Sequence, residues 1–300
     1  MREFAVKPDT EDSRLFETVT GIDQNGAAIT LPVINERPLC IWLNNREIVT
    51  AMTIGDHPEY LALGHVLNQG IIGPDHTVTG VEFDETIDVV VVRTAEPTPF
   101  EEKAVKRVRT SGCAMGTLFM DVLDALDKVR LPSDIKVKTS WLYSLSRKIN
   151  TVPSLYLKTG AIHGCALCDG EVPLVYMEDV GRHNAVDKIA GYMHAHGLSG
   201  SDKILYTTGR LTSEMIIKTV MMGIPVLFSR SGFTAWGVDL ARKTGLTLVG
   251  RAKGKRFIVL SGPERLEFDA DPNAVPEEPT HVRRKGSTRG TAGGTAGVAS

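Results

Sequence analysis

Residues 203–229, KILYTTGRLTSEMIIKTVMMGIPVLFS, decide the fold. The apolar runs at 203–209 and 224–229 have the length of buried strands, and the segment TSEMIIKTVMMG between them predicts a helix. A strand, a helix and a second strand in this order are typical of a βαβ unit with parallel strands. This stretch therefore predicts a sheet with helices packed on it.

The same alternation runs through residues 153–262. Strands that alternate with helical segments indicate βαβ units on a largely parallel sheet, which is an α/β fold. The other elements that we predict are extended runs at 154–160, 172–180, 246–250 and 256–262, and helices at 184–196 and 234–245.

The N-terminal part has a different pattern. The segment PLCIWLNNREIVTAMTI at 38–54 predicts two strands joined by a turn at Asn44-Asn45. A helix follows, with Pro58 in its first turn and Gly70 at its end. Two further strands, at 78–83 and 87–94, complete an α+β portion.

Composition limits the class of protein. The chain has 300 residues, of which 42% are hydrophobic and 23% charged, as expected of a globular protein of one or two domains. A formal net charge of −2 gives no overall attraction to nucleic acid. We find neither a signal peptide nor the ~18 consecutive apolar residues of a membrane span, and we expect a cytoplasmic protein without a membrane partner.

We expect four parts along the chain. They are an N-terminal extension at 1–30, the α+β portion at 31–105, an α/β domain with a mobile cysteine loop at 106–265, and a tail at 266–300. The tail is rich in Gly, Thr and Pro and is expected to be disordered.

Cations and glycines follow the predicted strands of the α/β domain. A glycine lets a backbone approach a ligand closely, and a cation or hydroxyl at a helix N-terminus favours an anion. An ordinary turn explains any one such junction, but four at one sheet edge favour a ligand with several phosphates. The residues concerned are Arg182 and His183, Arg210, Ser229 and Arg230, and the run Arg251, Ala252, Lys253, Gly254, Lys255 and Arg256.

Two carboxylates end a strand at the same edge. Glu178 and Asp179 can accept hydrogen bonds from ribose hydroxyls or a guanine ring, but solvated charge or capping of the next helix explains them equally well. Three roles stay open for His183, which are a capping partner, a ligand contact and a proton shuttle.

Cys113 is the strongest candidate for covalent chemistry. It lies in SGCAMG after the basic run VKRVR, and TLFMDVLDALDKV from residue 117 predicts a helix directly after it. Nearby cations and a helix N-terminus stabilise a thiolate, which can carry sulfur as a nucleophile. The alternative is a small residue packed under the helix.

The other cysteines are less distinctive. Cys40 lies in an apolar run and is expected to be buried. Cys165 and Cys168 form a C-x-x-C near His163, which suits a zinc site, a redox pair or buried packing. Zinc is the weaker interpretation because no second ligand pair is present, and Met115 stands where a nucleotide deaminase has its catalytic glutamate.

Several segments together resemble the formate dehydrogenase accessory sulfurtransferase family, FdhD. The resemblance spans about residues 36–260 and implies an α/β fold similar to that of cytidine deaminases, a mixed sheet with helices on both faces, without their zinc chemistry. The similar segments are EYLALGHVLNQGII, TSGC at 110–113, H-x-x-A-L at 163–167, EDVGRHNAVDK at 178–188, GRLTSEMIIK at 209–218, GIPVLFSRS at 223–231 and GLTLVGRAKGKR at 245–256.

The resemblance also implies a function. Cys113 corresponds to the family cysteine that carries a persulfide, and Arg251 to Arg256 to the segment that contacts the molybdenum bis(molybdopterin guanine dinucleotide) cofactor, the bound substrate. The implied partners are a cysteine desulfurase and the formate dehydrogenase catalytic subunit, and a homodimer stays open. Many members have C-x-x-C in the loop, whereas Met115 and Gly116 follow Ala114 here. Cys165 or Cys168 could then substitute for the absent cysteine.

Two other functions stay open. A cofactor chaperone would hold the molybdenum cofactor without moving sulfur and would not need Cys113. A zinc-dependent nucleotide hydrolase would need a bound metal, which Cys165 and Cys168 would have to hold.

Overall fold

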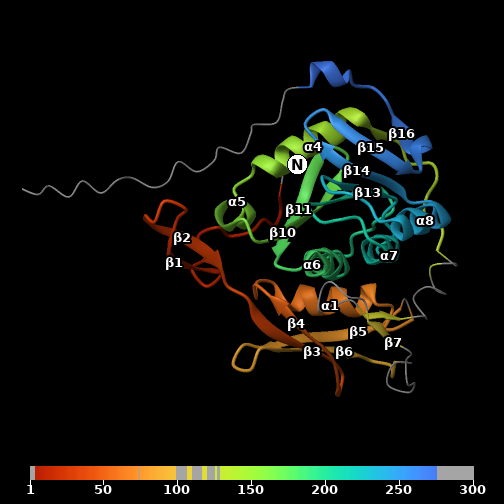
Figure 1. Cartoon of the computed structure of the whole chain (residues 1–300). Helices are drawn as coiled ribbons and strands as arrows, with labels where there is room; N and C mark the ends of the chain where they lie inside the picture. The colour runs from red at the N-terminus through yellow and green to blue at the C-terminus, as the bar shows by residue number, and fades with distance from the viewer. Residues whose placement is uncertain are drawn as a thin grey trace, which may run out of the picture.

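The computed structural model describes residues 4–73, 75–98, 107–109, 117–119, 126 and 129–275. Its main element is a six-stranded sheet in the order β11-β10-β12-β13-β14-β15 (Figure 1). The strands are β10 His163–Asp169, β11 Val172–Asp179, β12 Lys203–Thr207, β13 Val226–Ser229, β14 Thr247–Lys253 and β15 Arg256–Ser261.

The sheet is mixed, so the prediction of a largely parallel sheet is wrong in part. Strands β12, β13 and β14 pair in parallel as the βαβ pattern predicts. Strand β10 is antiparallel to both β11 and β12, and β15 is antiparallel to β14. Only Gly170 and Glu171 separate β10 from β11, and so short a connection permits only an antiparallel hairpin.

Helices cover both faces of this sheet, as expected. On one face lie α6 Arg182–Ala195, α7 Ser213–Met221 and α8 Ala235–Thr244, and on the other lies α4 Thr139–Thr151 (Figure 1). Alternation along the strands divides the core accordingly. Leu167 and Leu205 pack on the α6 face, whereas Ala166 and Tyr206 pack on the α4 face.

The N-terminal portion packs below α6 in Figure 1 and matches its predicted elements. Asn44 adopts φ +53° in the predicted turn, and α1 begins at Pro58. Its sheet has the order β4-β3-β6-β5, with α1 between it and α6. The elements are β3 Arg37–Leu43, β4 Arg46–Thr53, α1 Pro58–Asn68, β5 Val78–Asp84 and β6 Val89–Thr94.

Helices α1 and α6 join the two portions at very short range. A Cβ on Gly64 would lie 1.7 Å from the Asp187 carbonyl oxygen, and one on Gly191 would lie 2.0 Å from the Tyr60 carbonyl oxygen. Both obstacles are backbone atoms, which cannot move without shifting a helix. The two glycines therefore set how closely the helices pack.

We expect Gly64→Ala to lower the free energy of unfolding by about 1–3 kcal/mol or more, because overpacking at a backbone contact forces the helices apart. Gly73→Ala is the control, since a Cβ there meets nothing within 4 Å. Urea unfolding of both variants measures the difference. Equal stability of the two variants would contradict the packing described here.

Buried ions tie the same helices together. The Asp187 carboxylate lies 2.7 and 2.8 Å from Nζ of Lys218 on α7, and Asn68 of α1 donates to it at 2.7 Å. His65 Nδ1 lies 3.3 Å away. All four residues are buried. Burial alone would raise the pKa of Asp187, but Lys218 and His65 outweigh it and lower the pKa to about 2.

Three predicted elements differ from the structure. Residues 154–160 contain a helix, α5 Leu155–Thr159, because Ser154 caps it and Gly160 ends it at φ +77°. Strand β8 Thr117–Phe119 pairs with β7 Arg107–Arg109 where a helix was predicted to begin. The expected extension at 1–30 contains β1 Phe16–Ile22, which forms a hairpin with β2 Ala28–Ile34.

The chain end departs from the expectation of a disordered tail up to residue 275. Strand β16 Leu266–Glu267 pairs with β9 Val137–Lys138, and 3-10 turns lie at Pro263–Arg265 and Pro272–Ala274. Residues 276–300 lie outside the described part of the chain. None of the helices in the described part of the chain has the length and the apolar run that a membrane span requires.

Candidate functional site

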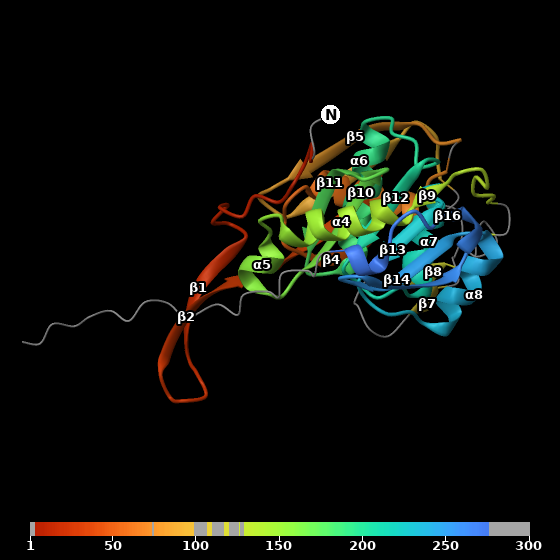
Figure 2. The ribbon, with the colours of Figure 1, turned by 90° about the horizontal axis from the view of Figure 1, so that it is seen from above.

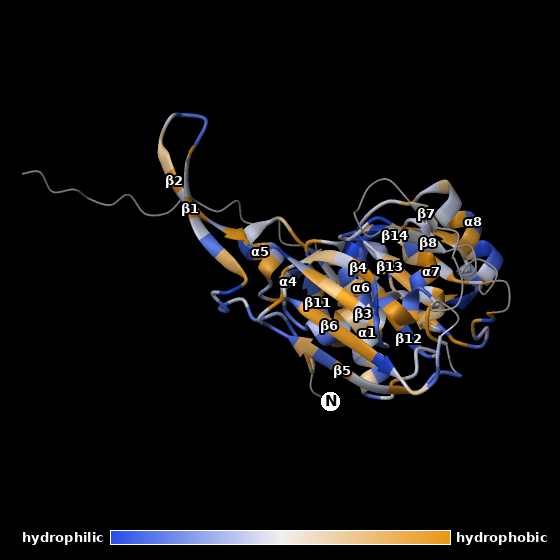
Figure 3. Ribbon diagram, turned by 90° about the horizontal axis from the view of Figure 1, so that it is seen from below, coloured by the Kyte–Doolittle hydropathy of each residue, from blue (hydrophilic) through white to orange (hydrophobic). Residues whose placement is uncertain are grey.

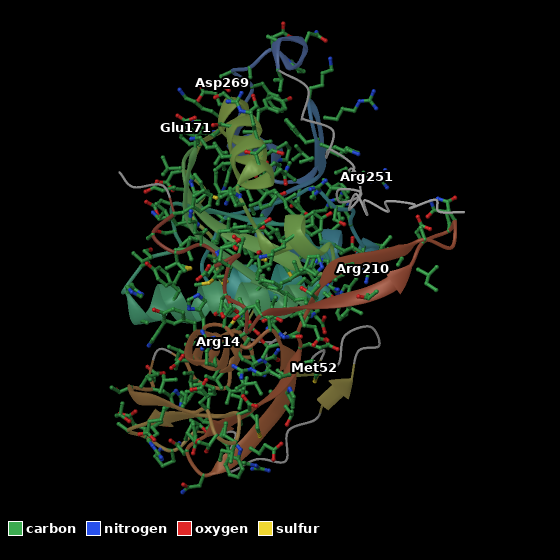
Figure 4. The ribbon with its side chains drawn as sticks, turned by 90° about the vertical axis from the view of Figure 1, so that its left-hand side faces the viewer. Arg14, Met52, Glu171, Arg210, Arg251 and Asp269 are labelled. Carbon is green, nitrogen blue, oxygen red and sulfur yellow. The ribbon has the colours of Figure 1, made fainter. Side chains whose placement is uncertain are left out.

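The functional site is built at the edge of the large sheet where β11, β12, β13 and β14 have their carboxyl ends. These strands run in one direction, so the residues after them gather on one side. Figure 4 shows Arg210 and Arg251 on this side together with Met52 of the smaller sheet. We call Arg182, Arg210, Arg230 and Arg251 the cationic edge.

The first two cations lie against one glycine. A Cβ on Gly209 would lie 2.9 Å from Cβ and 2.8 Å from Cδ of Arg182, so the Arg182 stem packs directly on the Gly209 backbone. Arg182 is buried, whereas Arg210, the next residue along, is exposed. Gly209 thus permits the close approach of an arginine of the chain itself, and the predicted close approach to a ligand stays a prediction.

Hydrogen bonds of Ser229 and of the backbone connect the loops that follow β12, β13 and β14. Ser229 is buried and donates to the Gly209 carbonyl oxygen at 2.7 Å, and it accepts from Ser231 N at 2.9 Å. Arg251 N donates to the Ser231 carbonyl oxygen at 2.7 Å, in a left-handed conformation with φ +53°. Ser229 therefore holds the loops in register and acts as a positioning residue.

The run from Arg251 to Arg256 contains the end of β14, a turn at Gly254 and Lys255, and the start of β15. Ala252 is buried in the core, Gly254 turns the chain at φ +57°, and the cationic side chains are exposed. Arg251, Lys255 and Arg256 line a hollow of about 590 Å³. Phe257, Phe268 and Tyr143 supply its aromatic lining, with the rings of Tyr143 and Phe257 5.6 Å apart.

His163 joins the cationic edge, whereas the sequence suggested it only as the histidine beside the C-x-x-C in the zinc interpretation. It begins β10, and its Nδ1 lies 3.4 Å from Thr208 Oγ1 after β12. Burial lowers the pKa of His163, and the nearby Arg182 and Arg210 lower it further. The signal that would have found it is the antiparallel course of β10, whose start lies beside the end of β12.

The two predicted carboxylates point inward. Glu178 and Asp179 are both 0% exposed. Asp179 lies 2.6 Å from Lys188 Nζ, and Thr53 and Asn184 donate to it at 2.5 and 3.0 Å. Asp179 therefore anchors α6 and the smaller sheet. Neither carboxylate caps the next helix, α6, as the alternative expected, and a role for either in ligand contact stays a prediction.

Glu178 caps a helix other than the expected one. Its carboxylate accepts from Leu155 N at 2.7 Å and Tyr156 N at 3.1 Å at the start of α5, and from the Tyr176 hydroxyl at 3.1 Å. Burial outweighs these donors and raises the pKa of Glu178 from 4.5 to about 7.

This pKa predicts a pH dependence of stability. The folded protein holds the Glu178 proton more tightly than the unfolded chain, so the free energy of unfolding should fall as pH rises from about 4.5 to about 7, by about 3 kcal/mol in total. Glu178→Gln should lose this contribution to the slope, even if it is less stable throughout. Urea unfolding across this range measures it, and an unchanged slope would contradict the assignment.

His183 connects two helices. It is buried at 3% exposure, and its Nε2 lies 3.0 Å from Glu214 Oε2 of α7. Burial lowers the pKa of His183 despite the opposing effect of Glu214. Of its three interpretations, the structure shows an internal partner, and a ligand contact or proton shuttle stays a prediction.

Cys165 and Cys168 lie on opposite faces of the sheet. Both are 0% exposed, and Cys165 packs in the core under α6 while Cys168 packs in the core under α4. Burial raises the pKa of Cys165 to about 12 and that of Cys168 still further. The pair cannot share one metal ion, and neither thiol has the thiolate character that a substitute for a loop cysteine needs.

Cys40 is only half-buried, not fully buried as predicted. It lies on β3, where the Trp42 indole donates to its sulfur at 3.1 Å.

Cys113 lies outside the described residues, but its flanking strands do not. The pair β7 and β8 lies on the same side of the molecule as Arg210 and Arg251 (Figures 3 and 4), although Figure 1 places β7 beside β5, below the large sheet. Because β8 begins at Thr117, the predicted helix directly after Cys113 is wrong, and the argument from a helix dipole is lost. The basic residues around Arg107 in the sequence still favour a thiolate at Cys113.

The comparisons with known proteins agree with one another. The sequence profile of the FdhD/NarQ family matches residues 34–267. The sulfur carrier protein FdhD of Bacillus subtilis is 30% identical over 235 residues, which are 78% of this chain and 90% of the relative. That of Listeria innocua is 31% identical over 237 residues, 78% of this chain and 91% of the relative.

A solved structure has the same fold. It is the crystal structure of a protein from Desulfotalea psychrophila assigned as a formate dehydrogenase accessory protein, with a TM-score of 0.69 and 27% identity over 84% of this chain and 98% of that one. The segment that matches the family profile contains the large sheet with its cationic edge. On these grounds the chain belongs to the FdhD/NarQ family.

Proposed function

We propose that this protein is a sulfur carrier for the maturation of formate dehydrogenase. Its relatives are named sulfur carrier proteins, and a structural neighbour is assigned as a formate dehydrogenase accessory protein. One observation carries the proposal: the strands that flank Cys113 lie on the same side as the cationic edge (Figure 4). A sulfur-bearing cysteine and an anionic acceptor could meet there.

The sulfur step requires a thiolate at Cys113. The donor is the persulfide of a cysteine desulfurase, whose terminal sulfur the Cys113 thiolate attacks. A new S–S bond forms at Cys113, the donor S–S bond breaks, and the donor cysteine leaves as its thiolate. Cys113 then holds the persulfide. When the acceptor takes the terminal sulfur, the S–S bond at Cys113 breaks and Cys113 returns to its thiolate, so the sulfur moves as neutral sulfur and the acceptor supplies the two electrons that reduce it to sulfide.

The proposed acceptor is the molybdenum bis(molybdopterin guanine dinucleotide) cofactor. Its pyrophosphates suit the cationic edge, where Arg182 and Arg210 flank Gly209. A guanine ring suits the aromatic lining of the hollow at Tyr143, Phe257 and Phe268, with Lys255 and Arg256 placed for its phosphates.

The two alternative functions, a cofactor chaperone and a zinc-dependent hydrolase, differ from the proposed one in which cysteines they need. A cofactor chaperone would use the same cationic edge without needing Cys113. A zinc-dependent hydrolase lacks support, because Cys165 and Cys168 face different cores and cannot hold one ion together.

GDP, a fragment of the cofactor, should bind to the purified protein. We expect Arg210→Ala and Arg256→Ala each to weaken binding by about 1–3 kcal/mol, the cost of losing a charge-assisted contact. Lys203→Ala is the matched control because Lys203 begins β12 at the opposite edge of the sheet from Arg210. Isothermal titration calorimetry measures all three, and undiminished binding in both arginine variants would place the nucleotide elsewhere.

A further inference from the structure

His163 lies beside the loop that carries two residues of the proposed phosphate site. It begins β10, which lies between β11 and β12 in the large sheet (Figure 2). Because β10 is antiparallel to β12, the start of β10 meets the end of β12. Gly164 N donates to Thr208 Oγ1 at 3.0 Å, and Thr208 N donates to the Gly164 carbonyl oxygen at 2.9 Å. These bonds hold His163 next to Gly209 and Arg210, which follow Thr208.

Charged groups of α6 and of the loop after β12 act on the half-buried His163 ring. Burial lowers the pKa of this ring, and Arg182, His183 and Arg210 lower it further. The ring is therefore neutral near pH 7, since an unperturbed histidine already has a pKa of about 6.5. His183 is buried, and its Nε2 lies 3.0 Å from Glu214 Oε2. Arg182 and Arg210 are thus the permanent cations that disfavour a proton on His163.

The carboxylates on the neighbouring strand β11 are already bound inside the protein. Asp179 lies opposite His163 in the pairing of β10 with β11, and its carboxylate lies 2.6 Å from Lys188 Nζ. Glu178 accepts from Leu155 N at 2.7 Å. Both carboxylates are buried. Neither is free to balance a positive charge on His163, whereas a phosphate bound at the cationic edge is.

The contact between His163 and Thr208 suits both protonation states of the ring. His163 Nδ1 lies 3.4 Å from Thr208 Oγ1. A hydroxyl donates to a neutral ring nitrogen and, once its hydrogen has rotated away, accepts from a protonated one. Gly164 N occupies one of the two lone pairs of this hydroxyl and leaves the other for the ring. Protonation of His163 therefore needs no movement of the loop.

We propose that His163 is the proton-accepting residue of the phosphate site at the cationic edge, and that it takes up a proton from solvent when a phosphate group binds beside Arg182 and Arg210. The phosphate offsets the repulsion from the two arginines and attracts the new charge. The protonated imidazole is then a third cation at the site and can form a charge-assisted hydrogen bond. This inference rests on the proposed function, because it takes a phosphate of the cofactor as the ligand.

Calorimetry with GDP tests the inference on the full-length chain. Titration near pH 7 in two buffers with different ionisation enthalpies gives the number of protons taken up per GDP bound. GDP itself releases protons at a cationic site, since the second pKa of a phosphate is about 6. His163→Asn, which keeps a polar side chain beside Thr208, measures this release alone. We expect the wild type to take up about 0.3 to 1 proton more than the variant.

The affinity for GDP should show the same difference. The ratio of the wild-type affinity to that of His163→Asn should grow about 3- to 10-fold as the pH falls from about 8.5 to about 6, because only the wild type gains a cation. His194→Gln is the control, an exposed histidine in the last turn of α6, at the opposite end of the helix from Arg182. It should behave as the wild type. Thermal unfolding followed by circular dichroism checks that each variant is folded.

The outcomes separate this inference from the proposed function. Equal proton uptake by the wild type and His163→Asn would overturn the inference, even where GDP binds and Arg210→Ala weakens its binding, and the proposed function would then stand. A variant that is weaker by one constant factor at every pH would likewise reduce His163 to a structural contact. If GDP does not bind to the wild type at all, both the inference and the proposed phosphate site are wrong.

Discussion

Cys113→Ala is expected to reduce the sulfur-dependent activation of formate dehydrogenase by about 100-fold or more, because removal of a covalent nucleophile leaves no route through the protein for the sulfur. The assay supplies a desulfurase, cysteine and the inactive dehydrogenase. The same variant should bind GDP like the wild type, since the cationic edge is built from other residues. Full activation by Cys113→Ala would favour the chaperone alternative.

Cys40→Ser is the control for this loss. Among the described residues, Cys40 is the one cysteine that is not fully buried, and it lies on β3 in the smaller sheet. We expect its substitution to leave activation unchanged. A loss in Cys40→Ser equal to that in Cys113→Ala would mean that sulfur moves through more than one cysteine.

Asp187→Ala is expected to lower the free energy of unfolding by about 3–5 kcal/mol, because it leaves the buried Lys218 ammonium without its partner. Asp239→Ala is the control, an exposed carboxylate on α8 whose loss should cost less than about 0.5 kcal/mol. Urea unfolding near neutral pH compares them. A similar small loss in both would contradict the buried network.

The contribution of Asp187 to the free energy of unfolding also depends on pH. Its folded pKa of about 2 lies below the value of 3.8 in the unfolded chain, so the stabilisation is present at higher pH and is lost as pH falls from about 4 to about 2.

Local patterns in the sequence sufficed for much of the fold. The run from β12 to β14 is predictable because strand and helix periodicities depend only on neighbouring residues. The turn at Asn44 and the start of α1 at Pro58 follow equally local rules. Helix α5 was also predictable, since Ser154 and Gly160 are cap residues at both ends of a short run.

Elements that depend on distant pairing were not predictable. Strand β8 forms because Thr117 pairs with Arg109 across the segment that contains Cys113, and no periodicity records such a contact. The place of β10 next to β12 brings His163 to the cationic edge in the same way.

The candidate site was predictable as an edge but not residue by residue. The arginines after β12, β13 and β14 do gather on one side, as strand direction requires. Glu178 and Asp179 also end a strand at this edge, yet both are 0% exposed. Leu155 N of α5 donates to Glu178, and Lys188 forms an ion pair with Asp179, so both carboxylates are directed into the protein. Opposite faces for Cys165 and Cys168 follow from strand alternation once β10 is known to be a strand.

The most direct test of the central claim is the mass of the protein after incubation with a cysteine desulfurase and cysteine. We predict an adduct of about 32 Da, one sulfur atom, on the peptide that contains Cys113, removable by a thiol reductant. Cys113→Ala should show no such adduct. An adduct on the peptide of Cys40, Cys165 or Cys168 with Cys113 unmodified, or no adduct at all, would contradict the account.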